Sequence, residues 1–287
     1  MKITFLGTSA GESYPAIWCD CPNCTYAREH GGRNIRMNTG SMIDDDILLD
    51  MNSCGFYTAA RLGVSLTGIR HLLVTHAHSD HLTMEPLYWR QVTPGAVEAS
   101  EAERVGMISP RFTSLPLMTV YGNSEVRERF SREAPGLFCE RMRLAFEEIR
   151  EGERVEKENL AFTPVRAQHS ALSHTYIIER GGKTLLYALD AGGYDDDMLS
   201  LILDNKYDAV VMEGTFGNSA NETPGHMNST GCIRFRRTLI EKGCISEGTP
   251  FFLTHLCPHW TPPYDLYAPE MAEKGFTVAY DGMIAEI

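Results

Sequence analysis

Short apolar runs recur along the chain, and each is stopped by Gly, Asp or another turn-forming residue. The runs are three or four residues long and rich in β-branched and aromatic side chains, a pattern typical of buried β-strands. We predict at least eight such strands, at residues 3–6, 47–49, 72–74, 162–165, 176–178, 184–187, 209–212 and 251–253.

Other segments show the 3.6-residue period of amphipathic helices. The period predicts helices at residues 55–62, 84–91, 198–203, 232–242 and 269–274. This interleaving is compatible with two packed sheets covered by helices, and equally with one doubly wound sheet. Because no Pro- or Ser-rich linker and no fixed repeat divides the chain, we predict a single domain over 1–287, with an insertion around the turn-rich stretch 92–116.

Composition narrows the class of protein. Apolar residues make up 43% and charged residues 22%, as in ordinary globular proteins. The formal net charge of −12 would repel a long nucleic acid. The amino-terminal apolar run is too short for a signal peptide or membrane span, so we expect a cytoplasmic protein without membrane contact and leave a homodimer open. In such a compartment, a compact group among the eight cysteines is read first as a metal site.

The clearest chemical signal is the segment Thr75-His76-Ala77-His78-Ser79-Asp80-His81, directly after a predicted strand. It contains three of the ten histidines and a carboxylate within six residues. Imidazole nitrogens and carboxylate oxygens are ligands that zinc prefers, and they suit manganese and iron as well. We therefore predict a metal site at this strand end.

Later strand ends carry further candidate ligands. His169, Asp190 and His255 follow the predicted strands at 162–165, 184–187 and 251–253. Each of them alone would more often cap a turn or make an ordinary hydrogen bond than bind a metal. Together with the first segment, they become candidates for completing a site that holds two metals.

This ordered set of residues resembles the metallo-β-lactamase superfamily over nearly the whole chain. Two further segments fit the same pattern: Leu6-Gly7-Thr8-Ser9 near the start of the chain and the strand Leu48-Leu49-Asp50. The resemblance implies an α/β fold, an αββα sandwich of two packed mixed sheets with helices on the outer faces. It also implies two divalent ions, zinc or manganese, at the edge of the strands.

The resemblance further assigns roles to the candidate residues. Asp190 would bridge the two metals, and Asp50 would support a ligand imidazole from behind. Asp80 would be catalytic as well as a ligand, since its loss would disturb the attacking hydroxide held between the metals. The ligands would divide into His76, His78 and His169 for one metal and Asp80, His81 and His255 for the other.

Within the superfamily, three features resemble the phosphonate-pathway phosphoribosyl cyclic phosphodiesterases. They are the Cys19-Asp20-Cys21-Pro22-Asn23-Cys24 segment, the Gly225-His226 pair and the Tyr280-Asp281-Gly282-Met283 ending. By this resemblance His226 would give a proton to the leaving group. We also expect a structural zinc on Cys19, Cys21 and Cys24, with His259 as fourth ligand or Cys257 as its substitute.

We therefore expect a hydrolase that acts on a small phosphodiester, cyclic ones included. Three alternatives remain open on sequence grounds. An RNA-processing nuclease of the same fold would call for a basic RNA-binding arm, and none is visible. A lactonase would use the same ligands, because pocket loops decide the substrate. A non-catalytic carrier that resembles the pyrroloquinoline quinone biosynthesis protein would not need a complete set of metal ligands.

Overall fold

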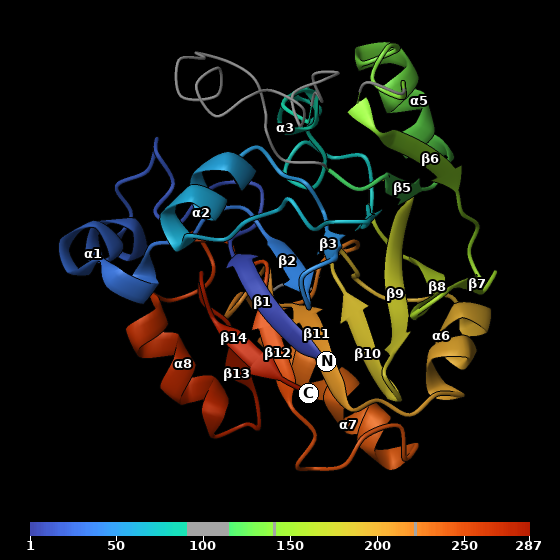
Figure 1. Ribbon diagram of the computed structural model, residues 1–287. Coiled ribbons are helices and arrows are strands. Elements are labelled where there is room, and N and C mark those ends of the chain that lie inside the picture. Colours follow the sequence, from blue (N-terminus) through green and yellow to red (C-terminus); the bar gives the residue numbers. More distant parts are fainter. Residues whose placement is uncertain (91–114, 140–141, 221–222) are drawn as a thin grey trace.

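The computed structural model describes residues 1–90, 115–139, 142–220 and 223–287, and within these ranges the strands form two sheets that face each other (Figure 1). The first sheet has the order β14 (Ile284–Glu286), β1 (Lys2–Gly7), β2 (Gly40–Ile43), β3 (Ile47–Leu49), β4 (His71–Leu73), β5 (Met118–Gly122) and β6 (Leu144–Glu148). The second has the order β13 (Thr277–Val278), β12 (Phe251–Thr254), β11 (Ala209–Glu213), β10 (Lys183–Ala188), β9 (Ser173–Arg180), β8 (Leu160–Ala167) and β7 (Val155–Lys157).

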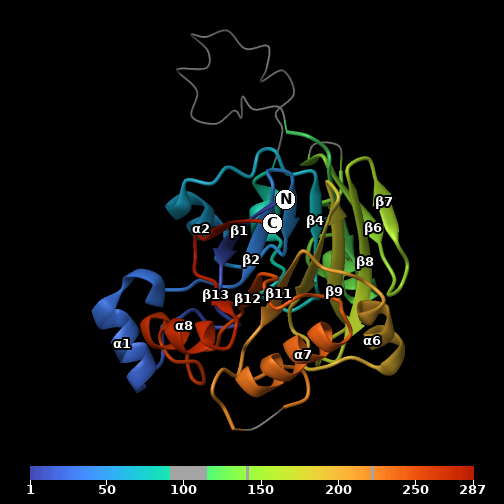
Figure 2. The same ribbon diagram turned by 90° about the horizontal axis from the view of Figure 1, so that it is seen from below.

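Helices cover the outer faces of both sheets. The first sheet carries α2 (Gly55–Leu62), α3 (Glu85–Tyr88) and α5 (Ser124–Glu133), and the second carries α6 (Asp196–Leu203), α7 (Ser229–Glu241) and α8 (Tyr264–Ala272). Helix α1 (Pro22–His30), followed by the 3₁₀ turn η1 (Gly32–Asn34), lies beside α8, as the view turned by 90° also shows (Figure 2). Segments from the two ends of the chain thus meet at one side of the sandwich.

Alternation along each strand divides its side chains between two layers of core. In β3, Ile47 and Leu49 point into the layer between the sheets, whereas Leu48 packs under the helices of the first sheet. In β10, Tyr187 joins the layer between the sheets and Leu186 joins the helices of the second. Because both faces of these strands are covered, their sequences are apolar throughout rather than alternating.

The predicted αββα sandwich is therefore confirmed, and all eight predicted strands are present. Strands β2, β5, β6, β7, β13 and β14 and helices α1 and α5 were not predicted. The helix predicted at 269–274 is wrong in its bounds, because α8 begins at Tyr264 and carries Pro269 inside it. The helix predicted at 84–91 is shorter, since α3 spans Glu85–Tyr88.

The insertion predicted around 92–116 falls, up to residue 114, outside the described residues. None of the helices in the described part of the chain combines the length and apolarity that a bilayer-spanning helix needs.

Candidate active site

The carboxyl ends of several strands meet at one edge of the sandwich. Strands β3 and β4 run parallel in the first sheet, and β10, β11 and β12 run parallel in the second. The residues that follow parallel strands leave the sheet at the same edge, where ligands commonly bind in α/β folds. The predicted ligands all lie on loops that begin there.

The first group of side chains that face one another is a histidine triad. The nitrogens of His76, His78 and His169 lie within 4.8 Å of one another. The Nε2 atom of His169 is 3.3 Å from Nδ1 of His78, and its own Nδ1 is held 3.0 Å from the Gly225 carbonyl oxygen. This carbonyl can only accept, so it favours the proton on Nδ1 and leaves Nε2 able to bind a metal.

The second group combines two histidines with a carboxylate. Donor atoms of Asp80, His81 and His255 also lie within 4.8 Å of one another. The Nε2 atoms of the two histidines are 3.2 Å apart, and Oδ2 of Asp80 is 3.3 Å from the one and 3.5 Å from the other. The three donors come from two distant segments and converge on one point.

Asp190 stands between the two groups. Its Oδ2 atom lies 3.0 Å from His81 Nε2 and 3.4 Å from His255 Nε2, whereas Oδ1 lies 3.7 Å from His169 Nε2. Each oxygen therefore faces a different group. Oδ2 and the Nε2 atom of His76 are buried and have no hydrogen-bond partner. Buried polar atoms left in this way are costly, and a bound cation would satisfy both.

The backbone at these strand ends is strained. Asp50, Asp190 and His255 all have positive φ values, of 64°, 47° and 59°. Such values are uncommon outside glycine and cost roughly 1–3 kcal/mol each, although Asp and His tolerate them better than most residues. Strain at three of the residues that line one cluster indicates that the fold places these side chains for a purpose other than stability.

The charges in the cluster favour a cation at its centre. Burial lowers the pKa of His81, but Asp190, Asp50 and Asp80 outweigh burial and raise that pKa well above its usual range. Burial alone would raise the pKa of Asp190, but His255 and His81 hold it well below its usual range. Ionised carboxylates that favour a proton on a neighbouring imidazole also favour a metal ion there, since the ion competes with the proton for the same nitrogen.

Asp50 lies behind this cluster, as the resemblance implies. Its Oδ2 atom is 2.7 Å from Nδ1 of His81, and both side chains are fully buried. The Thr75 backbone N–H donates to Asp50 Oδ1 at 2.7 Å. A carboxylate on Nδ1 keeps the proton there and turns Nε2 of His81 toward the other donors.

His226 lies at the edge of the same cluster, in the turn before α7. Its Nδ1 atom is 3.0 Å from Oε2 of Glu213 and 3.6 Å from Oδ1 of Asp190. Burial lowers the pKa of His226, but the charge and hydrogen bond of Glu213 outweigh burial and raise it to about 9. His226 therefore carries a proton at neutral pH, with Nδ1 committed to Glu213.

Glu213 is a candidate site residue that the sequence analysis missed. It is fully buried at the end of β11, where it accepts hydrogen bonds from the Ala191 N–H, at 2.5 Å, and from the Thr215 hydroxyl. The sequence could have indicated this residue. Glu213 stands at the end of an apolar strand, much as Asp190 and His255 follow the ends of theirs. It was not predicted because only His and Asp at strand ends were taken as candidate ligands.

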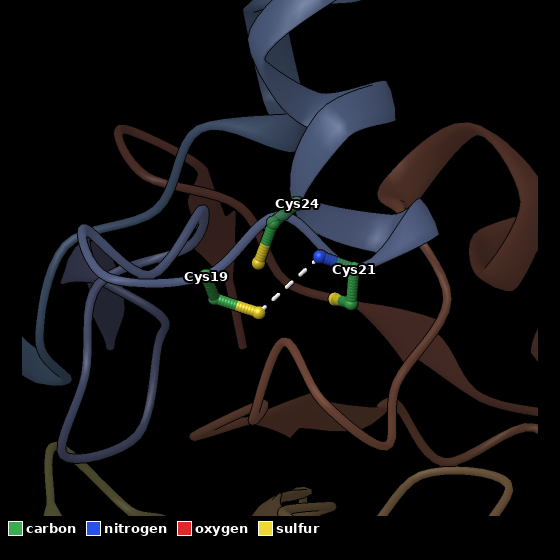
Figure 3. Close-up of side chains that lie close together, drawn as sticks. All are labelled: Cys19, Cys21 and Cys24. Atoms are coloured by element: carbon green, nitrogen blue, oxygen red, sulfur yellow. Dashed lines mark hydrogen bonds between the residues drawn. The ribbon is translucent and has the colours of Figure 1, made fainter.

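The three cysteines of the predicted structural site point toward one another (Figure 3). Their sulfur atoms lie within 4.8 Å of one another, and Cys21 is the residue before α1. Burial raises the pKa of the Cys21 thiol, but the N–H of Cys24 and the other hydrogen bonds around it outweigh burial and lower that pKa. A helix amino terminus favours a thiolate, the form that binds metals.

His259 reaches this cysteine group from the far end of the chain. Its Nδ1 atom lies 3.6 Å from Cys19 Sγ, and its Nε2 atom lies 2.6 Å from Glu12 Oε2. This contact with Cys19 favours His259 over Cys257 as the fourth ligand.

Comparison with known proteins places this geometry in a family. No curated protein matches the chain by sequence. Among solved structures, a diphosphatase of the PhnP family shares 18% identity at a TM-score of 0.72 and covers 100% of this chain and 98% of its own. The zinc-bound PqqB of Methylobacterium extorquens has the same identity and TM-score and covers 100% of both chains. Human tRNase Z, short form, shares 15% identity at a TM-score of 0.64 and covers 100% of this chain and 99% of its own.

At these identities the solved structures show that the fold is shared. The sequence itself matches the family model described as the beta-lactamase superfamily domain over residues 55–245. That range includes the segment from His76 to His81 as well as His169, Asp190, Glu213 and His226. The chain therefore belongs to the β-lactamase superfamily domain family.

Proposed function

We propose that this protein is a metal-dependent phosphodiesterase that acts on a small phosphodiester, cyclic ones included. One observation carries the proposal: Asp190 faces two complete groups of donor atoms with its two oxygens, and the imidazole of His226 lies 3.6 Å from Oδ1 of Asp190. A site with two divalent ions and an adjacent proton donor has the parts that phosphodiester hydrolysis requires.

The donor set fits the proposed ions. His76, His78 and His169 would hold one, Asp80, His81 and His255 the other, and Asp190 both. Nitrogen and carboxylate oxygen suit zinc and manganese alike. When bound, such ions polarise a phosphoryl oxygen and activate water at neutral pH.

His226 would supply the proton that the leaving alkoxide needs. Its Nδ1–H is held by Glu213, so Nε2–H is the group free to donate. The Glu213 carboxylate would also stabilise the charged imidazole between turnovers, since its charge and hydrogen bond raise the pKa of His226. Glu213 would therefore orient the proton donor without touching the substrate.

The charge of the chain supports a small substrate. A net charge of −12 disfavours long nucleic acids, whereas a single phosphodiester needs only the local positive charge of the ions and of His226. Two of the structural neighbours are a diphosphatase and a tRNase, both named for acting on phosphate bonds. Lactones and RNA are the competing substrates.

We also propose that Cys19, Cys21, Cys24 and His259 hold a structural zinc. The convergence of three sulfurs and the Nδ1 atom of His259 supports this proposal. Four protein ligands would leave no open position for a substrate, so the ion would tie the amino-terminal loop to the segment after β12.

A turnover screen with parallel metal analysis tests the proposed function. The purified protein would be offered bis-p-nitrophenyl phosphate, ribose cyclic phosphates, lactones and a precursor RNA. We expect turnover of the phosphodiesters and not of the lactones or the RNA. Phosphodiester turnover absent from a metal-loaded sample, or lactone hydrolysis that exceeds it, would reject the proposal.

The variant His226→Ala tests the proton donor separately. General acids typically contribute about 10²- to 10⁴-fold, so we expect a loss of this size for a diester with an alkyl leaving group. The loss should be far smaller for a p-nitrophenyl leaving group, which departs without a proton. His30→Ala, an exposed histidine on α1, is the matched control. Equal losses on both substrates would remove His226 from this role.

A further inference from the structure

Two threonine hydroxyls each lie between a buried carboxylate and a candidate ligand histidine. In the second sheet, the Thr215 hydroxyl donates to Oε2 of Glu213 and lies 2.8 Å from Nδ1 of His255. Glu213 and Thr215 are both buried, at 0% and 5% exposure. The three side chains form one continuous hydrogen-bonded row that ends on the metal cluster.

The first sheet repeats this row with different residues. The Thr75 hydroxyl lies 3.1 and 3.0 Å from the two carboxylate oxygens of Asp50, and 3.1 Å from Nδ1 of His76. It also lies 3.2 Å from Nδ1 of His81, whose proton goes to Asp50 at the shorter distance of 2.7 Å. Asp50, Thr75 and His76 are all buried. Each sheet thus contributes one carboxylate, one threonine and one histidine at the same edge of the sandwich.

The direction of the hydrogen bonds in each row is set by the number of protons available. A carboxylate can only accept, and a hydroxyl has one proton to give. The threonine proton therefore goes to the carboxylate, and the remaining hydroxyl lone pairs accept from the histidine. Nδ1 must then carry the imidazole proton, which leaves the lone pair on Nε2.

In both histidines Nε2 is the atom that faces the cluster. His255 Nε2 lies 3.2 Å from His81 Nε2 and 3.4 Å from Asp190 Oδ2. His76 Nε2 is buried and has no hydrogen-bond partner. The opposite tautomer would place a proton on these atoms and block them as ligands.

We propose that Thr75 and Thr215 are positioning residues that fix His76 and His255 in the tautomer able to bind metal. The inference rests on the proposed function, because it concerns the affinity of the same cluster for its ions. It adds two residues that touch neither metal nor substrate and act only through the histidines.

Removing each hydroxyl without changing the shape of the side chain tests the inference. Thr215→Val and Thr75→Val are nearly isosteric, and Thr215→Ser restores the hydroxyl. Thr254→Val is the matched control, since Thr254 is fully buried beside His255 and its hydroxyl has no hydrogen-bond partner. Thermal unfolding of the metal-free variants would show that each one folds.

The readout is the affinity for Mn²⁺, measured from the free ion by electron paramagnetic resonance and not from turnover. Manganese is chosen because the thiolates of the cysteine group select zinc. Losing a supporting residue behind a ligand histidine typically weakens metal binding by about 10- to 100-fold. We expect that loss for both valine variants, and near wild-type affinity for Thr215→Ser and Thr254→Val.

The outcomes separate this inference from the proposed function. Wild-type protein that binds neither Mn²⁺ nor any Zn²⁺ beyond the cysteine-bound ion would reject the proposed function and, with it, this inference. Wild-type protein that binds Mn²⁺ while folded Thr215→Val and Thr75→Val bind it equally well would reject the inference alone. A loss in Thr215→Ser as large as in Thr215→Val would also reject it, because the hydroxyl would then not be the group that matters.

Discussion

The two candidate metal centres are assembled in opposite ways. The cluster around Asp190 draws its donors from loops after β4, β8, β10 and β12, so it exists only once both sheets have packed. The cysteine group takes three of its donors from six consecutive residues, and only His259 comes from elsewhere. The first centre is a product of the whole fold, and the second is largely local.

The residues that support the ligands also differ between the two centres. The Asp190 cluster is supported by buried carboxylates, Asp50 and Glu213, which reach the histidines directly or through a threonine. The cysteine group is supported by helix N–H groups and by an exposed contact between His259 and Glu12. Rigid, buried support suits a site that performs chemistry. Ligands that lie mostly within one short segment suit a structural metal site that holds two segments together.

Removing a ligand from the first centre should have the largest effect on turnover and should separate the two centres most clearly. Asp80→Ala should lower turnover by at least about 10³-fold, because the ions contribute several kcal/mol to the reaction and each 1.4 kcal/mol is tenfold. The zinc of the cysteine group should remain in place. Steady-state kinetics and metal analysis on the same sample measure both effects.

Asp45→Ala provides the control for this variant. Asp45 is an exposed acidic residue whose contact is a surface ion pair with Lys2. Its loss should change neither turnover nor metal content. Near wild-type turnover of fully metal-loaded Asp80→Ala would contradict the assignment of the first centre.

Removing a ligand from the second centre should act through folding. We expect Cys21→Ser to lose about one zinc ion per chain and to unfold at least roughly 5 °C lower, since a lost structural site removes binding energy that stabilises the fold. Molecules that remain folded should keep residual turnover. Cys139→Ser, at an exposed cysteine, is the control. Unchanged zinc content in Cys21→Ser would rule the site out.

The two centres also show what a sequence can and cannot predict. His76, His78, Asp80 and His81 were predicted as a group because their spacing is local. His169, Asp190 and His255 could be found only by searching the loop after each strand, and the family resemblance then gave the order. The fold was predictable from the same resemblance, because strand and helix patterns alone allowed two architectures.

The features that could not be predicted depend on contacts between distant side chains. Nothing in the spacing of Glu213, Thr215 and His255 shows that they form one row, because the row appears only when β11 and β12 pair. Strand β7 was missed because its residues are only partly buried and mostly polar, and β6 was missed because its short apolar run, Leu144 to Phe146, leads directly into two glutamates. Helix α8 was misplaced because Pro269 was taken as a beginning when it lies inside the helix.

The smallest effect concerns a histidine that belongs to neither centre. His174 in β9 is fully buried, and neither of its ring nitrogens has a hydrogen-bond partner. Burial lowers its pKa to about 4, and the nearby Glu151 carboxylate, 3.9 Å from Nε2, only partly opposes this. His174 thus shows what burial does to the pKa of a histidine that makes no hydrogen bond to a carboxylate.

The lowered pKa of His174 predicts the direction in which the free energy of unfolding changes with pH. The folded pKa lies below the value of about 6.5 in an unfolded chain, so the unfolded chain binds the proton more tightly. Stability from this residue is complete above pH 6.5 and is lost as the pH falls toward 4. Between pH 7.5 and 5 the loss should be about 2 kcal/mol, and His174→Leu should abolish it. Urea unfolding of both proteins at the two pH values measures the difference, in which the contributions of other titrating groups cancel.

Metal content should not change in His174→Leu, because His174 is not a ligand. An identical pH dependence in the two proteins would show that His174 is not held neutral, and the contrast with the ligand histidines would then fail.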